Sequence, residues 1–585
     1  MRIRVSLLCI FVWAGGVWAC GGCDCAQLDV AGEVAGDSGD DDSGCPTPPC
    51  WNDDLDEGRH CFGPAEGCED WEVADRGSGL VETPEGFLTL DRDVDSIHVV
   101  WPPSTGTGGV FRVDSRTLEV TGEFRTAPGL GDQAGSDRPA ASAVDAFANL
   151  LVASRGGGPV WSAVTKIAAD PTSCPDVDGD GVVETSRGMG DVHDFPSDEE
   201  WGDECILWHT TLGVSTSAAA WAIVLKRDPG LDGAVVETAW VGLHTESRFI
   251  ELDVETGVPT GVEARIGGPG VYSAGVHDAA IDRDGWVWVV GYYAWGMFDT
   301  NDPADSYRQA PAPGGALEHW KPSRVIVDEN DAVWTSGMNG GVWRLAADRE
   351  TWSHPAGLDD SYGIATDGAG SIWVGPAINQ LSVYRVDNDD ALAYHRVDSP
   401  NVAGYEVAAD LDGHVWVFGW PNGDGGLWGT NSVAVIDVDT EEAQVVLDDC
   451  AGGDCLRSPS PTGYIAGLQE RDEIGPLGRW SAIVEGCAEG ETAWELMSVD
   501  GTAPPGASIA ASVRAADTLD DLGARGWTVL GSLPEAGPDF DLVPVLGTDA
   551  GSVLEVRTVL STEDPAIAPV LRGVTIEWSC PDVVE

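Results

Sequence analysis

Short runs rich in Val, Ile, Leu and aromatic residues recur along most of this chain, and Gly, Asp and Asn separate them. After residue 70, no segment of useful length has its apolar residues at helical spacing. β-Branched and aromatic runs of this kind favour strands, and the small and polar residues between them favour turns. The pattern therefore predicts an all-β protein.

One strand–turn–strand unit is repeated along the chain. In five segments an aspartate stands six residues before an apolar or aromatic residue, and the last four aspartates are 46, 39 and 43 residues apart. A period of this size is typical of the blades of a β-propeller. The segments are "VDAFANLLV" (Asp145), "IDRDGWVWV" (Asp282), "VDENDAVWT" (Asp328), "TDGAGSIWV" (Asp367) and "ADLDGHVWV" (Asp410).

A second motif follows each turn, for example "GGVWRLA" and "LSVYRVD". Its side chains alternate between two faces, so we interpret it as the third strand of a blade. Together with two degenerate units around His98 and Trp240, the motifs predict a seven-bladed β-propeller in residues 91–480, with six or eight blades as alternatives. A terminal strand is expected to close the ring, either "GYIAGLQ" (463–469) or "GFLTLD" (86–91).

The repeated tryptophans stand at a regular place in the second strand, so we expect them in the core between blades. The repeat aspartates are expected to accept backbone hydrogen bonds in the turn between the first two strands. Aromatic residues that follow strands into long loops are better candidates for ligand contact, namely Tyr292, Tyr293, Trp295 and Trp420.

After Cys487 the pattern changes to strands at short spacing with polar turns. Residues 481–585 are therefore predicted to form a C-terminal β-sandwich, jelly-roll-like in type. Such domains bind carbohydrate or cap a neighbouring domain, and these residues do not separate the two roles.

The N-terminal end has the features of an export signal. A basic start precedes an apolar run from Val5 to Val17, too short to remain as a membrane-spanning helix, so residues 1–19 are predicted to be a signal peptide. "VWAC" resembles the lipobox of bacterial lipoproteins, which implies lipidation of Cys20 and a place in the cell envelope, at the outer membrane or extracellular surface. Secretion after ordinary cleavage is the alternative. Residues 20–90 are acidic and rich in Gly, Pro and Cys, which predicts a tether.

The charge balance excludes some classes of partner. The chain has 31 Lys and Arg against 98 Asp and Glu, a formal net charge of -67. Nucleic acids and anionic membrane surfaces would be repelled, so the expected membrane contact is through the lipid anchor only. Cations or cationic partners fit better, although such charge also serves simply to keep a protein soluble.

The cysteines suggest disulfides. Of the 14 cysteines, Cys9 lies in the signal and Cys20 at the anchor, which leaves an even number in an exported chain. Six of these lie in the tether, where the sequence does not pair them and a metal–thiolate cluster is an alternative. Proximity predicts three pairs in the remainder: Cys174 with Cys205, Cys450 with Cys455, and Cys487 with Cys580.

The segment "CPDVDGDGVVETS" spaces oxygen donors as a hard cation requires. Arg187 stands at position twelve in place of the bidentate glutamate of an EF-hand, so this is a DxDxDG loop of another type. It lies in an insertion, about residues 170–208, with little apolar content, which favours structural calcium and a disulfide as its source of order. A calcium switch or calcium-mediated ligand site is the alternative. The predicted ligands are Asp176, Asp178, Asp180, the Val182 carbonyl and Glu184.

The repeat x-A-x-D-x-x-G-x-x-W-V, with Pro322 preceding Asp328 in "KPSRVIVD", resembles the streptogramin lyase (virginiamycin B lyase) and NHL-type propellers. The resemblance implies the propeller fold and, as one possibility, a metal-dependent lyase. A lyase of that kind needs His and Glu at the channel mouth, because a divalent ion polarises the ester while a base removes a proton. Propellers host many unrelated functions, so the motif is weak evidence of activity.

Residues four or five positions before each repeat aspartate begin the innermost strand and are expected to line that mouth. Among them His277 and Glu406 are the candidate catalytic base and metal ligand. Arg324, Tyr362 and Tyr405 are candidate ligand contacts. These residues do not form the His and Glu set of the lyases, so the favoured function is binding of a glycan or protein ligand through the propeller. A streptogramin-lyase-like enzyme and a structural envelope protein are the alternatives.

Overall fold

The structure, a computed structural model, describes residues 10–13, 16–20 and 25–28 and most of residues 57–580. Its internal gaps of four residues or more are 72–79, 91–97, 128–138, 156–161, 178–181, 197–201, 214–217, 230–234, 268–274, 314–321, 420–431, 448–461, 464–476, 488–491, 534–537 and 563–566. The three N-terminal strands, β1 (Ile10–Trp13), β2 (Gly16–Cys20) and β3 (Cys25–Leu28), form a small antiparallel sheet. No helix in the described residues is long and apolar enough to cross a membrane.

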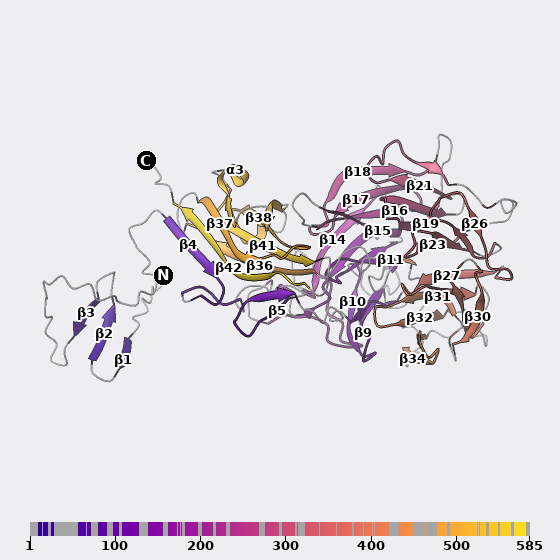
Figure 1. Ribbon diagram of the computed structural model, residues 1–585, viewed down its shortest axis with the longest axis horizontal. Coiled ribbons are helices and arrows are strands. Elements are labelled where there is room, and N and C mark those ends of the chain that lie inside the picture. The colour runs from indigo at the N-terminus through magenta and orange to yellow at the C-terminus, as the bar shows by residue number, and fades with distance from the viewer. Residues whose placement is uncertain are drawn as a thin grey trace.

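Seven antiparallel sheets follow one another in the described chain between residues 99 and 447 (Figure 1). We number them I to VII in chain order. Sheet I contains β7 (Val99–Val100), β8 (Pro103–Ser104), β9 (Gly109–Asp114) and β10 (Val120–Arg125). Sheet II contains β11 (Pro139–Val144), β12 (Leu150–Ser154), β13 (Ser162–Ile167) and β14 (Ile206–Leu212), and sheet III contains β15 (Ala220–Pro229), β16 (Val235–Leu243), β17 (Arg248–Asp253) and β18 (Pro259–Arg265).

The other four sheets repeat the same order of strands. Sheet IV contains β19 (Val276–Ile281), β20 (Trp286–Gly291), β21 (Trp295–Asp299) and β22 (Arg308–Gln309). Sheet V contains β23 (Arg324–Val327), β24 (Val333–Ser336), β25 (Trp343–Leu345) and β26 (Trp352–Ser353). Sheet VI contains β27 (Ser361–Thr366), β28 (Ser371–Pro376), β29 (Ser382–Asp387) and β30 (Tyr394–Asp398). Sheet VII contains β31 (Gly404–Ala409), β32 (His414–Gly419), β33 (Val433–Asp437) and β34 (Ala443–Leu447).

These sheets form a closed ring. Each consecutive pair of sheets shares a hydrophobic core. The last pair closes the ring, because Val100 and Phe111 of sheet I lie in one core with Trp416 and Phe418 of sheet VII. From sheet II onward, the first strands of neighbouring sheets also lie beside one another. The chain is therefore a β-propeller, as the repeat predicts.

In the sheets that have it, the repeat aspartate holds the first turn together. In sheet IV, Asp282 Oδ1 accepts the backbone N–H of Asp284 and of Trp286 at 3.1 and 2.9 Å, as predicted. Its Oδ2 accepts Trp288 Nε1–H at 2.8 Å. The same side-chain bond joins Asp328 to Trp334 and recurs in sheets VI and VII. These tryptophans are 0% exposed, so their predicted place in the core is confirmed.

The same aspartates also tie neighbouring sheets together. Arg349, in the turn between β25 and β26 of sheet V, donates from Nη2 to Asp282 Oδ2 of sheet IV at 2.9 Å. Asn388, in the corresponding turn of sheet VI, donates from Nδ2 to Asp328 Oδ2 of sheet V at 2.8 Å. Each aspartate thus accepts bonds from its own turn, its own tryptophan and the next sheet.

Of the two segments proposed to close the ring, one approaches the propeller. β35 (Thr462–Gly463) includes the first residue of "GYIAGLQ" and runs parallel to β11, with Thr462 opposite Ala141. The remainder of that segment lies outside the described residues. The other segment, "GFLTLD", contains β6 (Leu88–Leu90), which pairs with β5 (Leu80–Glu82) and with the C-terminal strand β42 (Val570–Ser579). Closure by that segment is therefore wrong.

A second domain consists of two antiparallel sheets around one core (Figure 1). The first sheet has the order β36–β41–β38–β39, and the second has the order β40–β37–β42–β6–β5, with β4 also paired to β42. Both sheets supply the core, for example Trp480 and Trp494, each 0% exposed. The elements not yet named are β4 (Glu57–Phe62), β36 (Leu477–Glu485), β37 (Ala493–Thr502), β38 (Ala507–Ala516), α2 (Leu519–Leu522), β39 (Thr528–Leu533), β40 (Asp539–Asp541), α3 (Val543–Leu546) and β41 (Val553–Thr562).

The tether predicted for residues 20–90 is too long at its C-terminal end. Strands β4, β5 and β6 lie within it, and β4 runs antiparallel to β42. Figure 1 shows the indigo β4 beside the yellow β42. The local sequence is polar, but Phe62, Trp71 and Leu88 are at most 2% exposed in the core of the two-sheet domain, which explains why this segment folds.

Three disulfides join described cysteines. Two of them are the predicted pairs, Cys174–Cys205 and Cys487–Cys580. The third joins Cys61 to Cys68, a pair that the sequence left open. Cys450 and Cys455 lie outside the described residues.

Candidate functional site

The starting residues of the first strands gather at one end of the ring. Trp221, His277, Tyr362 and Tyr405 are each the second residue of their strand, and Arg324 is the first residue of β23. Contacts between these side chains show that the strands begin at the same end, as the sequence predicts. We call the group the mouth cluster; its members are Arg155, Trp221, His244, His277, Asp278, Arg324, Tyr362, Tyr405 and Glu406.

An ion pair between sheets V and VII forms the centre of the mouth cluster. Arg324 Nε lies 3.3 Å from Glu406 Oε2, and Nη2 bonds to Oε1, so both carboxylate oxygens accept from one guanidinium. Nη1 donates to the carbonyl of Ser323 at 2.8 Å. Arg324 is 5% exposed and Glu406 1% exposed. A two-point pair of this kind fixes the guanidinium plane.

Arg324 of sheet V reaches Glu406 of sheet VII across sheet VI, because β27 and β31 approach each other closely. A Cβ at Gly363 of β27 would lie 2.6 Å from the Cα of Glu406, so only glycine fits there. β27 therefore lies directly against β31, and the long Arg324 side chain reaches across it.

A second buried carboxylate lies near this ion pair. Asp278 of sheet IV is 4% exposed, and its Oδ2 accepts the backbone N–H of Val325 at 3.1 Å. Burial raises the pKa of Asp278 to about 6, and the charge of Arg324 opposes that rise. Burial likewise raises the pKa of Glu406 to about 7, against the charge and hydrogen bonds of Arg324. Two acids thus share one cation in a site with little water.

Two tyrosines lie on this charged group. The rings of Tyr362 and Tyr405 stack with centroids 4.0 Å apart and planes 23° apart. The Arg324 guanidinium lies 4.6 Å from the Tyr362 ring centroid, in cation–π geometry. Burial, with the nearby Tyr362 and Glu406, raises the pKa of Tyr405 well above its ordinary value. Tyr362 is partly exposed, so the stack is not completely buried.

The other half of the mouth cluster is an aromatic group on sheets III and IV. The Trp221 ring lies 4.7 Å from the rings of both His244 and His277. Arg155, which follows β12, lies 5.0 Å over the Trp221 ring. Burial, and then the charges of Arg324 and its neighbours, lower the pKa of His277 to about 3, so its imidazole is neutral. Burial lowers the pKa of His244 also, whose Nδ1 lies 2.8 Å from the Val276 carbonyl.

The structure brings together all five site residues predicted for the mouth, but it gives Glu406 a different partner. Both oxygens of Glu406 bond to Arg324, and no group of three His, Cys, Asp or Glu side chains in the described chain could hold a metal ion. The catalytic roles of His277 and Glu406 stay predictions. Of the aromatic loop candidates, Trp295 is 9% exposed in the core between sheets IV and V, so it is not a surface residue. Tyr292, Tyr293 and Trp420 lie outside the described residues.

Sequence reasoning missed Trp221 and Arg155. Trp221 occupies in β15 the position that His277 occupies in β19, the second residue of the first strand. Sheet III lacks the repeat aspartate and was recognised only through Trp240 in its second strand. Alignment of its first strand would have revealed Trp221. No local signal distinguishes Arg155.

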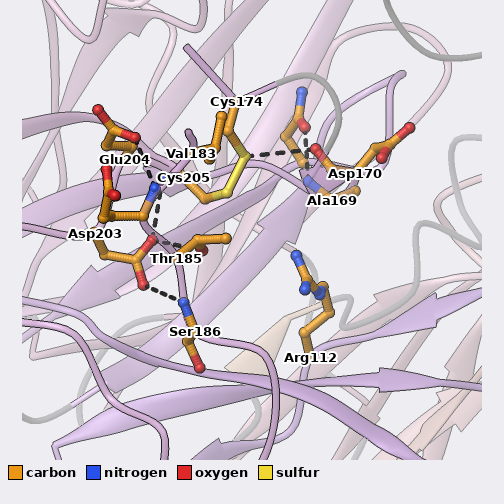
Figure 2. Close-up of a disulfide and its surroundings, with 12 residues drawn as sticks. Arg112, Ala169, Asp170, Cys174, Val183, Thr185, Ser186, Asp203, Glu204 and Cys205 are labelled. Atoms are coloured by element: carbon orange, nitrogen blue, oxygen red, sulfur yellow. Dashed lines mark hydrogen bonds between the residues drawn. A yellow bond between two sulfur atoms is a disulfide. The ribbon is translucent and has the colours of Figure 1, made fainter. Parts of the chain in front are cut away.

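The predicted calcium loop is described only at its ends. Asp176, Asp178 and Asp180 lie outside the described residues, and the Val182 side chain is 52% exposed. Glu204, beside the disulfide shown in Figure 2, accepts the backbone N–H of Val177 through Oε1 at 2.7 Å and that of Glu184 through Oε2 at 2.8 Å. One carboxylate thus bonds to the backbone near both ends of the loop.

Asp203 strengthens this attachment. It accepts Thr185 Oγ1–H at 2.8 Å, and the backbone N–H groups of Ser186 and Cys205 at 3.2 and 3.1 Å (Figure 2). Burial raises the pKa of Asp203 above its ordinary value, although these bonds oppose the rise. The insertion is therefore held by a disulfide and by two adjacent acids.

No protein-family model matches the sequence, and no curated protein matches it. Among solved structures, virginiamycin B lyase from Staphylococcus aureus aligns over 62% of this chain and 95% of its own, with 11% identity and a TM-score of 0.37. Regucalcin, a calcium-binding protein from Agrobacterium tumefaciens, aligns over 45% and 81%, with 15% identity and a TM-score of 0.28. The Pan2 WD40 domain of Neurospora crassa aligns over 52% and 78%, with 12% identity and a TM-score of 0.32. The ring of sheets defines the propeller by itself, and these values say nothing of the ligand.

Proposed function

We propose that this protein is an exported binding protein whose mouth cluster recognises a glycan or a protein ligand. The observation that carries the proposal is the set of partly exposed rings, Trp221, His244 and Tyr362, in a mouth cluster that also contains a buried ion pair. Binding sites typically combine such aromatic surface with a few fixed polar groups.

A saccharide fits this surface best. The exposed parts of Trp and Tyr rings offer apolar surface to the C–H groups of sugars, and their N–H or O–H groups add hydrogen bonds at the edge. The rings of the mouth cluster are already fixed by contacts with one another and with Arg324, so little side-chain freedom remains to be lost on binding. A protein ligand would use the same rings as anchors.

The geometry does not favour the lyase alternative. A lyase of the type considered needs a carboxylate or imidazole that is available to a divalent ion. Both carboxylate oxygens of Glu406 bond to Arg324, and the two side chains are almost completely buried.

The test is binding of residues 20–585 to an array of bacterial and environmental glycans, with Trp221→Ala and Tyr362→Ala as variants. Loss of one stacking ring at the mouth should weaken binding about tenfold or more, which corresponds to about 1.4 kcal/mol. Trp343→Ala is the matched control, because Trp343 is a partly exposed tryptophan on β25, the third strand of sheet V. Binding that survives both mouth changes but is lost in Trp343→Ala would place the site elsewhere.

We further propose that the chain is anchored through a lipid on Cys20 and faces the cell exterior. The charged start, the apolar run and the "VWAC" sequence support this location. The two-sheet domain, which begins at β4, would then lie next to the anchor. Cys20→Ser should move the protein from the membrane fraction to the soluble fraction. Unchanged fractionation would contradict the proposed lipid anchor.

We also propose that calcium in the DxDxDG loop is structural. Glu204 and the Cys174–Cys205 disulfide support this assignment, because both fix the ends of the loop and leave its oxygen-rich middle to be ordered by a cation. Asp176, Asp178, Asp180, Glu184 and the Val182 carbonyl would hold the ion.

A further inference from the structure

The buried ion pair of the mouth cluster lies beside a second acid. Asp278 and Glu406 together carry one negative charge more than Arg324 can neutralise. Asp278 comes from sheet IV, Arg324 from sheet V and Glu406 from sheet VII, so the group connects three sheets across the mouth. All three side chains are at most 5% exposed. Ionisation of both acids therefore leaves an uncompensated negative charge where water cannot screen it.

The neighbouring groups do not remove this excess. His277, next to Asp278, is neutral because burial and the nearby positive charges lower its pKa to about 3. Burial also lowers the pKa of His244, which disfavours its protonated form. Tyr405 is uncharged near neutrality because burial raises its pKa, and the partly exposed guanidinium of Arg155 lies over the Trp221 ring. A single proton shared by the two acids completes the charge balance.

We propose that Asp278, Arg324 and Glu406 form a proton-sensing lock that sets the position of the Tyr362–Tyr405 stack. With the proton on Asp278, Arg324 pairs with the Glu406 carboxylate alone and lies over the Tyr362 ring. When the proton leaves, Asp278 competes for the same guanidinium and draws it from the Tyr362 ring. Burial raises the pKa of both acids into the range between about 6 and 7, so this change falls near neutral pH. The effect on ligand binding rests on the proposed function, whereas the lock itself does not.

The lock can be tested on the protein without ligand. The tyrosine band in near-ultraviolet circular dichroism should titrate once between about pH 5 and pH 8 in the wild type. In Asp278→Asn that transition should be lost, since one carboxylate then faces one guanidinium and Asn Oδ1 still accepts the Val325 N–H. Glu406→Gln should also lose it, with Asp278 left as the partner of Arg324. Asp203→Asn is the control, because Asp203 is another buried acid with a raised pKa but lies beside the Cys174–Cys205 disulfide.

A wild type without the transition, or an unchanged transition in Asp278→Asn, would overturn the lock. The glycan array, run at pH 5.5 and pH 8, separates this inference from the proposed function. A blank array at both pH values counts against the binding function and leaves the dichroism to decide on the lock. Binding that changes several-fold with pH in the wild type but not in Asp278→Asn supports the coupling. Binding that ignores pH while the tyrosines titrate contradicts it.

Discussion

The carboxylate of Glu255 lies 3.5 Å from Nη1 of Arg479, across the junction between the propeller and the two-sheet domain. Glu255 follows β17 in sheet III, and its other oxygen lies 3.5 Å from Nη1 of Arg557 in β41. Arg479 also lies over the Phe147 ring of sheet II at 4.7 Å. Burial alone would raise the pKa of Glu255, but the charges of Lys166, Arg479 and Arg557 hold it well below its ordinary value.

Glu255→Gln should loosen this junction. We expect a loss of about 1–2 kcal/mol in the free energy of unfolding, near the lower end for a buried ion pair because the Glu255 side chain is 30% exposed. The measurements are chemical denaturation and small-angle X-ray scattering, which would report a larger radius of gyration. Because the folded-state pKa is lowered, the stabilisation is complete above the unfolded-state pKa and is lost on acidification. The difference between wild type and variant should therefore begin to shrink once the pH falls below the unfolded-state pKa of a glutamate, and it should vanish only as the pH passes the lowered folded-state pKa.

Glu251→Gln is the control for that experiment, since Glu251 lies in β17, shortly before Glu255, and accepts a hydrogen bond from Thr260 within sheet III. Equal losses in the two variants would contradict a role for Glu255 at the junction.

Trp334→Phe should destabilise the propeller. The change removes the indole N–H that Asp328 Oδ2 accepts at 2.7 Å and leaves a small void in a fully buried site. We expect a loss of about 2–4 kcal/mol, from a bond to a charged group and from reduced packing. Thermal unfolding measures it. Trp286→Phe, at a half-buried position of the neighbouring sheet, should lower the free energy of unfolding clearly less. Equal losses in the two variants would argue against a stabilising bond between Trp334 and Asp328.

Stability should fall on mild acidification in a way that depends on His277. In the folded protein its pKa is about 3, mainly through burial, whereas the unfolded chain binds a proton near pH 6.5. The unfolded state therefore holds more protons between these values, so stability rises with pH there. His277→Phe keeps a ring against Trp221 and should remove about 2 kcal/mol of the loss between pH 7 and pH 5. Identical pH profiles of wild type and variant would show that His277 is charged when folded.

Chelation of calcium should expose the insertion at about residues 170–208 before any other part of the folded protein. The loop then keeps Glu204 and the disulfide but lacks its cation, so limited proteolysis with a chelator should cut between Val177 and Glu184 first. Glu204→Gln should increase cutting there even with calcium present, because the amide accepts through only one oxygen. First cuts within sheets III to VII would contradict structural calcium.

The parts of this fold that repeat could be predicted from the sequence. The aspartate and tryptophan six residues apart are a local signal, and the structure explains it by the bond from Trp288 Nε1 to Asp282 Oδ2. The same alignment placed Arg324, Tyr362 and Glu406 at one end of the ring. What it could not give was the partner of Glu406, because the Arg324 pairing depends on the close approach of β27 and β31 at Gly363.

Pairing between distant parts of the chain also escaped prediction. Thr89 Oγ1 donates to the Pro569 carbonyl at 2.7 Å, over a separation of 480 residues. Residues 57–90 are too polar and too interrupted to indicate a strand by themselves. They fold because a core built from the other end of the chain receives Phe62, Trp71 and Leu88.

The insertion of β4 and β6 beside β42 also gives the protein a mechanical property. Tension applied at the N-terminal end of the chain enters the folded part at β4, which is hydrogen-bonded along its length to β42. The covalent path to the propeller then passes through β5 and β6 and residues 91–97. These strands must detach before the pull reaches sheet I, while the Cys61–Cys68 bond keeps the residues it encloses from extending. Under such a load β4, β5 and β6 are therefore expected to detach before the propeller unfolds.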